Sequence, residues 1–93
     1  MNRYIIERDL PGAGSLTPVQ IQGASQTSNA VLASMAPNIQ WVRSFVTADR
    51  IYCEYLAETE QLVRDHAKAA GLPCSKVSLV TRVIDPTTAT TPV

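Results

Sequence analysis

The chain has 93 residues, which is the size of one small domain. Its 8 lysines and arginines are balanced by 8 aspartates and glutamates, and this zero net charge argues against a nucleic-acid partner, which needs a basic surface. Hydrophobic residues make up 45% and charged residues 17%, so the chain is too apolar and too uncharged to be disordered. A chain this short leaves much surface exposed, and a partner subunit would help it to fold.

Cysteine usage and the lengths of the apolar runs indicate the compartment. Cys53 and Cys74 are too few for a disulfide framework and lack the CxxC spacing of zinc and redox sites. No secretory signal pattern opens the chain, and no apolar run approaches the roughly 20 residues of a membrane span. We therefore expect a cytoplasmic protein with no membrane partner.

The first half of the chain predicts a strand followed by a helix. A run of β-forming residues at 4–8 is stopped by a glycine-containing breaker. Thr17 is placed to cap a helix, because Pro18 suits the first helical position and Gln20 completes a capping box. Apolar residues then recur at helical spacing, and Pro37 ends the helix.

The second half predicts two strands, a helix and a last strand. Residues 39–47 and 51–56 are rich in β-forming residues, and the short turn between them favours an antiparallel hairpin. Thr59 is expected to cap the second helix, and Gly71 is expected to end it in the left-handed conformation. Residues 77–84 alternate as a final strand.

The element order β-α-β-β-α-β is that of a ferredoxin-like α+β fold. Both helices are expected to cover one face of a four-stranded antiparallel sheet, because crossover connections are right-handed. The bare face is expected to meet a second copy of the chain, in an assembly of the dimeric α+β barrel type. Residues 1–86 would form this single domain, and the Thr/Pro-rich residues 87–93 a flexible tail.

The alternation of side chains along the strands puts one charged residue of each strand on the open face. These four residues are Glu7, Arg43, Glu54 and Arg82, framed by Trp41, Phe45, Tyr52 and Leu56. Two interpretations stay open. The charges either form cross-strand salt bridges within a dimer interface, or they form a polar ligand-binding site in an apolar frame.

The helix-side face carries a second set of candidate residues. His66 is the only histidine and falls on the apolar stripe of the second helix, with Tyr55 or Ser28 as hydrogen-bond partners across a pocket. It is either a core histidine or a catalytic acid or base that works with Tyr55, Arg8 or Glu7. Cys53 is either a small buried side chain or a metal ligand together with His66. Arg8 belongs to the same strand face.

Several short motifs resemble a known family. The motifs lie at residues 4–8, 41–46, 52–55, 64–67, 71–73 and 83–86. In this order they resemble the small bacterial proteins grouped as domain of unknown function 4242, some of which are described as nickel-responsive or nickel-binding. The resemblance spans about residues 3–86 and implies a ferredoxin-like fold, dimers packed through their sheets, and a divalent transition metal such as nickel. Many members have a histidine at the position of Arg43, so the metal-ligating residues that the resemblance implies here are Glu7, Cys53 and His66.

We therefore expect a small homodimeric protein that binds a transition metal or a small ligand without turnover. One alternative is a small dimeric α+β barrel enzyme with His66 as its acid or base. The other is an interaction module in which the charges of the open face hold two copies together. Fold alone does not choose among these, because ferredoxin-like folds host many activities.

Overall fold

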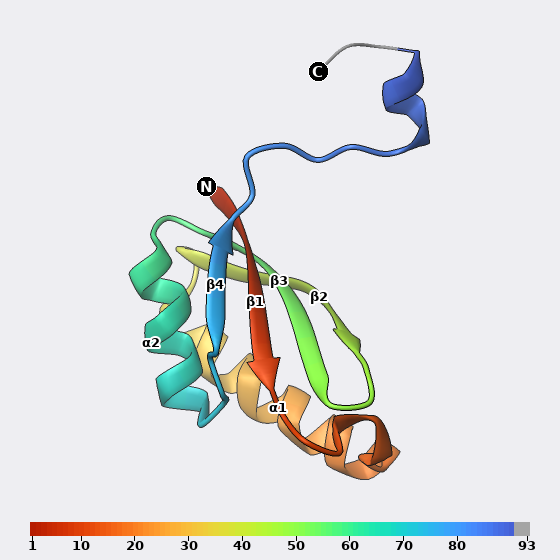
Figure 1. The fold of residues 1–93 in the computed structure, drawn as a ribbon. Coiled ribbons are helices and arrows are strands. Elements are labelled where there is room, and N and C mark those ends of the chain that lie inside the picture. Colours follow the sequence, from red (N-terminus) through yellow and green to blue (C-terminus); the bar gives the residue numbers. More distant parts are fainter. Residues whose placement is uncertain (91–93) are drawn as a thin grey trace.

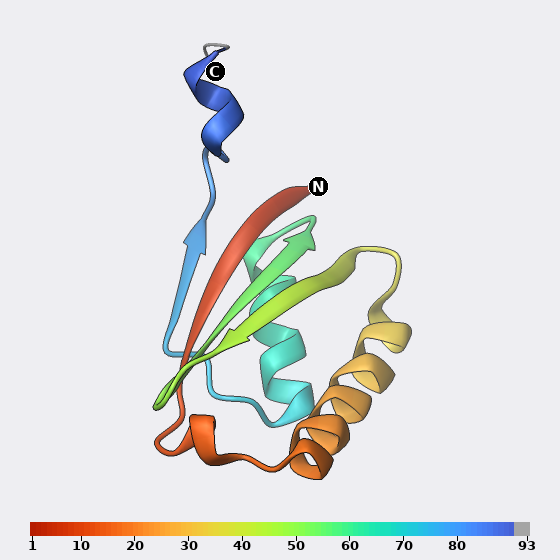
Figure 2. The ribbon, with the colours of Figure 1, turned by 90° about the vertical axis from the view of Figure 1, so that its right-hand side faces the viewer.

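The computed structural model describes residues 1–90 and shows a four-stranded antiparallel sheet in the order β2-β3-β1-β4. The strands are β1 (Asn2–Asp9), β2 (Ile39–Val46), β3 (Arg50–Ala57) and β4 (Lys76–Leu79). The helices α1 (Pro18–Met35) and α2 (Glu60–Ala70) lie on the same side of this sheet, and the other side is bare (Figure 2). The predicted α+β fold is confirmed.

The helix ends are held by the residues that the sequence indicated. Thr17 Oγ1 accepts a hydrogen bond from the Gln20 amide, and the Gln20 side chain accepts one from the Thr17 amide, so the capping box is complete. Thr59 caps α2 by accepting from the Leu62 amide. Gly71 ends α2 at φ 69°, in the left-handed region that other residues adopt only with strain.

The hydrophobic core lies between the sheet and α2. β1 contributes Tyr4 and Ile6, and α2 contributes Val63 and Ala67, all of them buried. In contrast, the only buried residue of α1 is the polar Ser28. α1 therefore buries fewer side chains than α2 does.

The predicted position of Trp41 on the open face is wrong, because β2 contains a β-bulge. Trp41 pairs with Tyr55 and Arg43 pairs with the next β3 residue, Glu54, so Val42 is an extra residue in β2. The bulge reverses the alternation, and Trp41 therefore shares the helix-side face with Tyr55 instead of framing the open face. Simple alternation of side chains cannot reveal such an insertion.

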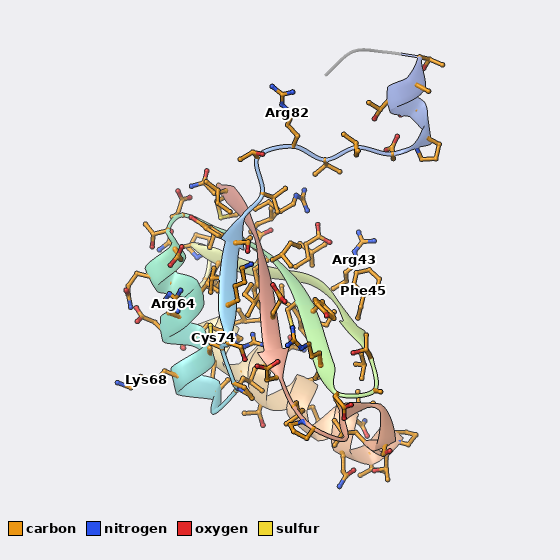
Figure 3. The ribbon with its side chains drawn as sticks, in the orientation of Figure 1. Arg43, Phe45, Arg64, Lys68, Cys74 and Arg82 are labelled. Atoms are coloured by element: carbon orange, nitrogen blue, oxygen red, sulfur yellow. The ribbon has the colours of Figure 1, made fainter. Side chains whose placement is uncertain are left out.

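The last strand is shorter than the predicted 77–84. The register Tyr4↔Leu79 places Thr81 opposite the first residue of β1, Asn2, and β1 offers no partner beyond that point. The final ladder bond runs from the Val80 amide to the Arg3 carbonyl at 2.9 Å. Arg82 consequently lies beyond the sheet and is not part of its open face (Figure 3).

The segment after β4 leads away from the sheet and helices (Figure 1). It ends in a short 3-10 turn, η2 (Pro86–Ala89), capped by Asp85. Of the predicted tail 87–93, residues 91–93 lie outside the described residues, and its flexibility stays a prediction. Within residues 1–90 no helix has the length and apolar character needed to cross a membrane.

Candidate ligand-binding cavity

A partly open cavity of about 280 Å³ lies between the N-terminal half of α1 and the sheet. This volume is close to the lower end of the roughly 300–1,000 Å³ of small-molecule sites. Its walls are mostly apolar and come from the sheet, from α1 and from the neighbouring loops. The lining residues are Arg8, Leu16, Ile21, Ala24, Ser25, Ser28, Trp41, Ser44, Val46, Ile51, Cys53, Tyr55 and Leu72.

The composition of α1 explains why the space is not filled. At the C-terminal end of the helix, Leu32 and Met35 pack against the core. At the N-terminal end, Ala24 and Ser25 line the cavity, and their side chains are too short to fill it. The sequence of α1 therefore leaves room for a small molecule at one end of the helix only.

Arg8 is the one charged residue on the walls, which all belong to the described part of the chain. It is only 2% exposed. Its Nε donates to Cys53 Sγ at 3.3 Å and its Nη1 donates to the Pro73 carbonyl at 2.6 Å, whereas Nη2 has no partner among residues 1–90. The ion pairs of that part of the chain use other arginines, and none includes Arg8. A buried positive charge without a nearby carboxylate is costly, because desolvation is not repaid by an ion pair.

A chain of polar contacts connects Arg8 to β2. Ser44 Oγ donates to Cys53 Sγ at 3.0 Å, and Trp41 Nε1 donates to Ser44 Oγ at 2.9 Å. The Cys53 sulfur therefore accepts from two donors, Arg8 and Ser44. These contacts fix the orientation of the Trp41 ring on the cavity wall.

His66 lies directly behind the cavity wall and is fully buried. Its Nε2 is 3.2 Å from Ser28 Oγ, and its ring centroid is 5.3 Å from that of Tyr55, so both predicted neighbours contact it. Burial lowers the pKa of His66, a hydrogen bond with the Ser28 backbone partly opposes this, and the nearby charge of Arg8 also lowers it. Burial also raises the pKa of the Tyr55 phenol, against the charge of Arg8. Both rings are therefore neutral near pH 7.

The structure does not bring the three predicted metal ligands together. Glu7 faces the open side of the sheet, whereas Cys53 and His66 lie on the helix side. Within residues 1–90, no group of three or more His, Cys, Asp or Glu side chains is placed to hold a metal ion. Transition-metal sites usually need three or more ligands, so the residues of one chain do not fit nickel.

The open face carries two ion-pair groups in place of the predicted set of four charges. Glu54 pairs with Arg3 and, at 3.2 Å, with Arg43. Glu7 pairs with Arg50 at 3.2 Å. Arg3 and Arg50 were not predicted, although the antiparallel register puts them beside Glu54 and Glu7. Arg43 and Phe45 project from β2 at the same surface, with Phe45 60% exposed (Figure 3).

The sequence pattern placed Arg8 on the helix-side face and offered it only as one possible partner of a catalytic His66, not as a ligand-binding residue. The signal was present, since a charged residue at a core position of a strand needs a partner or a function. Trp41 was missed as a cavity residue, because the bulge in β2 has no signature in the sequence.

The fold and the cavity define a small α+β protein with a partly open cavity beside one helix. Comparison with known proteins identifies its family. The sequence pattern of the family described as "Nickel responsive protein SCO4226-like" matches residues 4–80, and the chain belongs to that family. The domain 4242 label is compatible with this match and stays a prediction.

One solved structure supports the fold. The crystal structure of SCO4226 from Streptomyces coelicolor A3(2) superposes with a TM-score of 0.74 at 18% identity, covering 88% of this chain and 99% of that chain. At this identity the similarity bears on the fold alone. Among curated proteins, none matches the chain in sequence.

Proposed function

We propose that this protein binds a small organic molecule in the cavity between α1 and the sheet, without turning it over. The observation that carries the proposal is the cavity itself. It combines mostly apolar walls with a buried, unpaired guanidinium and several hydroxyl groups. An apolar pocket with a few converging polar groups is the usual form of a small-molecule site.

The same geometry favours an organic ligand over a metal ion in one chain. Cys53 has the Arg8 guanidinium at 3.3 Å from its sulfur, and a positive charge at that distance repels a cation. His66 has Nε2 engaged with Ser28. The family name refers to a nickel response, and a metal shared between copies of the chain or a link of another kind to nickel is compatible with an organic ligand in the cavity.

The enzyme alternative loses its proposed acid or base. His66 is not among the residues that line the cavity, and it is fully buried behind Ser28 and Tyr55. A general acid or base must reach the proton that it transfers, directly or through one water. We therefore assign His66 to the support of the wall.

We further propose that two copies pair through the open face of the sheet. This face carries both acidic and basic side chains around the exposed Phe45, so it can meet a rotated copy of itself with opposite charges facing each other. The homodimer is a prediction from the sequence, and the charges and Phe45 of this surface support it. The cytoplasmic location also stays a prediction from the sequence.

Ligand binding can be measured through Trp41, which is the only tryptophan of the chain and lines the cavity. We expect benzoate, benzamide or hexanoate to change its fluorescence and to raise Tm, since binding to the native state raises stability. Ala24→Phe should abolish the response, because Ala24 lines the cavity and a larger ring fills it. Gln22→Phe, on the same helix but off the cavity wall, is the matched control. The proposal fails if none of these compounds binds, or if both variants bind as the wild type does.

A further inference from the structure

We infer that the ligand of this cavity is a small organic anion, a carboxylate on an apolar body, whose carboxylate pairs with Arg8. The inference rests on the proposed function and adds the chemical class of the ligand. It follows from the charge, the free donors and the apolar walls of the site.

The charge of the site is unbalanced. Arg8 is 2% exposed and is the only charged side chain among the residues that line the cavity. No carboxylate of residues 1–90 pairs with it, whereas each of the described open-face arginines Arg3, Arg43 and Arg50 has an acidic partner. An anion in the cavity would supply the missing partner, and its attraction to the guanidinium is strong because both groups lie away from bulk water.

The hydrogen-bond donors of Arg8 are not all used. The guanidinium carries five N–H donors, and two of its nitrogens are engaged by Cys53 and Pro73. Nη2 has no partner within residues 1–90. Arginine binds carboxylates through two parallel hydrogen bonds, which a neutral amide cannot reproduce.

The walls exclude the simplest anions. Ile21, Ile51 and Trp41 line the cavity, and burying apolar ligand surface against them is favourable. Inorganic phosphate or sulfate offers no apolar surface and would lose its hydration on entering. The volume of about 280 Å³ suits a body of one ring or a short branched chain.

Matched pairs of compounds test the inference on the wild-type protein. We expect benzoate to bind at least about tenfold more tightly than benzamide, and hexanoate more tightly than hexanamide, because a charge-assisted hydrogen bond is stronger than a neutral one. Inorganic phosphate should not change Trp41 fluorescence. Equal or tighter binding of the amides overturns the anion class but leaves the cavity as a binding site. If neither the acids nor the amides bind, the proposed function is wrong as well.

Variants of Arg8 locate the preference. Arg8→Met should reduce the ratio of benzoate to benzamide affinity to about one, because it removes the charge and keeps much of the apolar length. Arg50→Met, which removes an arginine of the open face, should leave the ratio unchanged. Arg8→Lys is the second variant, for use if Arg8→Met does not fold. It keeps the charge but not the two parallel hydrogen bonds, so it should keep only part of the preference for benzoate. Two results contradict the pairing with the guanidinium. One is a folded Arg8→Met variant that still prefers benzoate to benzamide, and the other is an Arg8→Lys variant whose preference is as large as that of the wild type.

Discussion

His66 should make the folded protein lose stability as the pH falls through its ordinary titration range. The imidazole is fully buried, and burial lowers its pKa in the folded chain. Below about pH 6.5 the unfolded chain binds a proton that the folded chain does not bind, so stability is lost as the pH falls. We therefore compare the free energy of unfolding at about pH 7.5 and about pH 5.5, on either side of the ordinary pKa of histidine.

The magnitude follows from a single proton. Each pH unit below the unfolded pKa is worth at most about 1.4 kcal/mol, and integration from about pH 7.5 to about pH 5.5 also gives at most about 1.4 kcal/mol, which is the limit for a folded chain that binds no proton in this range. Small domains have free energies of unfolding of roughly 5–15 kcal/mol, so the loss is measurable. The groups that face the ring are Ser28, Tyr55 and Arg8, and burial raises the pKa of Tyr55 further above this interval.

Urea unfolding at the two pH values measures the effect. His66→Gln is the control, because glutamine keeps hydrogen-bonding groups near Ser28 and does not titrate. As His66 is the only histidine, the difference between wild type and variant isolates its contribution. We expect the wild type to lose more stability than the variant, by up to about 1.4 kcal/mol. Equal losses in the two proteins would refute the neutral, buried imidazole.

Three further predictions test other parts of the account. Ser28→Ala should cost about 1–3 kcal/mol in urea unfolding, because it leaves His66 Nε2 buried without a partner, and an unchanged midpoint contradicts this. Phe45→Glu on the open face should shift the sedimentation of a dimer to that of a monomer, whereas Val19→Glu on α1 should not; a dimer that persists in Phe45→Glu argues against this interface. NiCl₂ should change Tm by the same amount in the wild type and in Cys53→Ser, and a nickel response lost with Cys53 would revive the single-chain metal site.

The fold could be predicted because its signals are local. Thr17 with Gln20, Thr59 and Gly71 mark the helix ends through capping chemistry that depends on neighbouring residues only. The short hairpin turn after Val46 fixed the antiparallel pairing of β2 and β3. Consistency among these local features was enough for the order and the class of the fold.

The parts that escaped prediction depend on distant contacts. The bulge at Val42 and the end of β4 at Leu79 follow from the register of paired strands, which one strand alone does not encode. Helical spacing in α1 indicated a buried face, but not that Ala24 and Ser25 would leave a cavity against the sheet. The contact between Ser28 and His66 was predicted, because both residues fall on inward faces of their helices. The functional roles assigned to Glu7, Arg43, Glu54 and Arg82 stay predictions, and Arg82 lies off the sheet.

A crystal structure of the protein grown with benzoate would show directly whether the cavity binds a carboxylate. We expect benzoate in the cavity, with its carboxylate within hydrogen-bond distance of the Arg8 guanidinium and its ring against Trp41. An occupied cavity in which the carboxylate points away from Arg8 would contradict the ligand class. A cavity closed by α1, with benzoate absent at high concentration, would contradict the binding site itself.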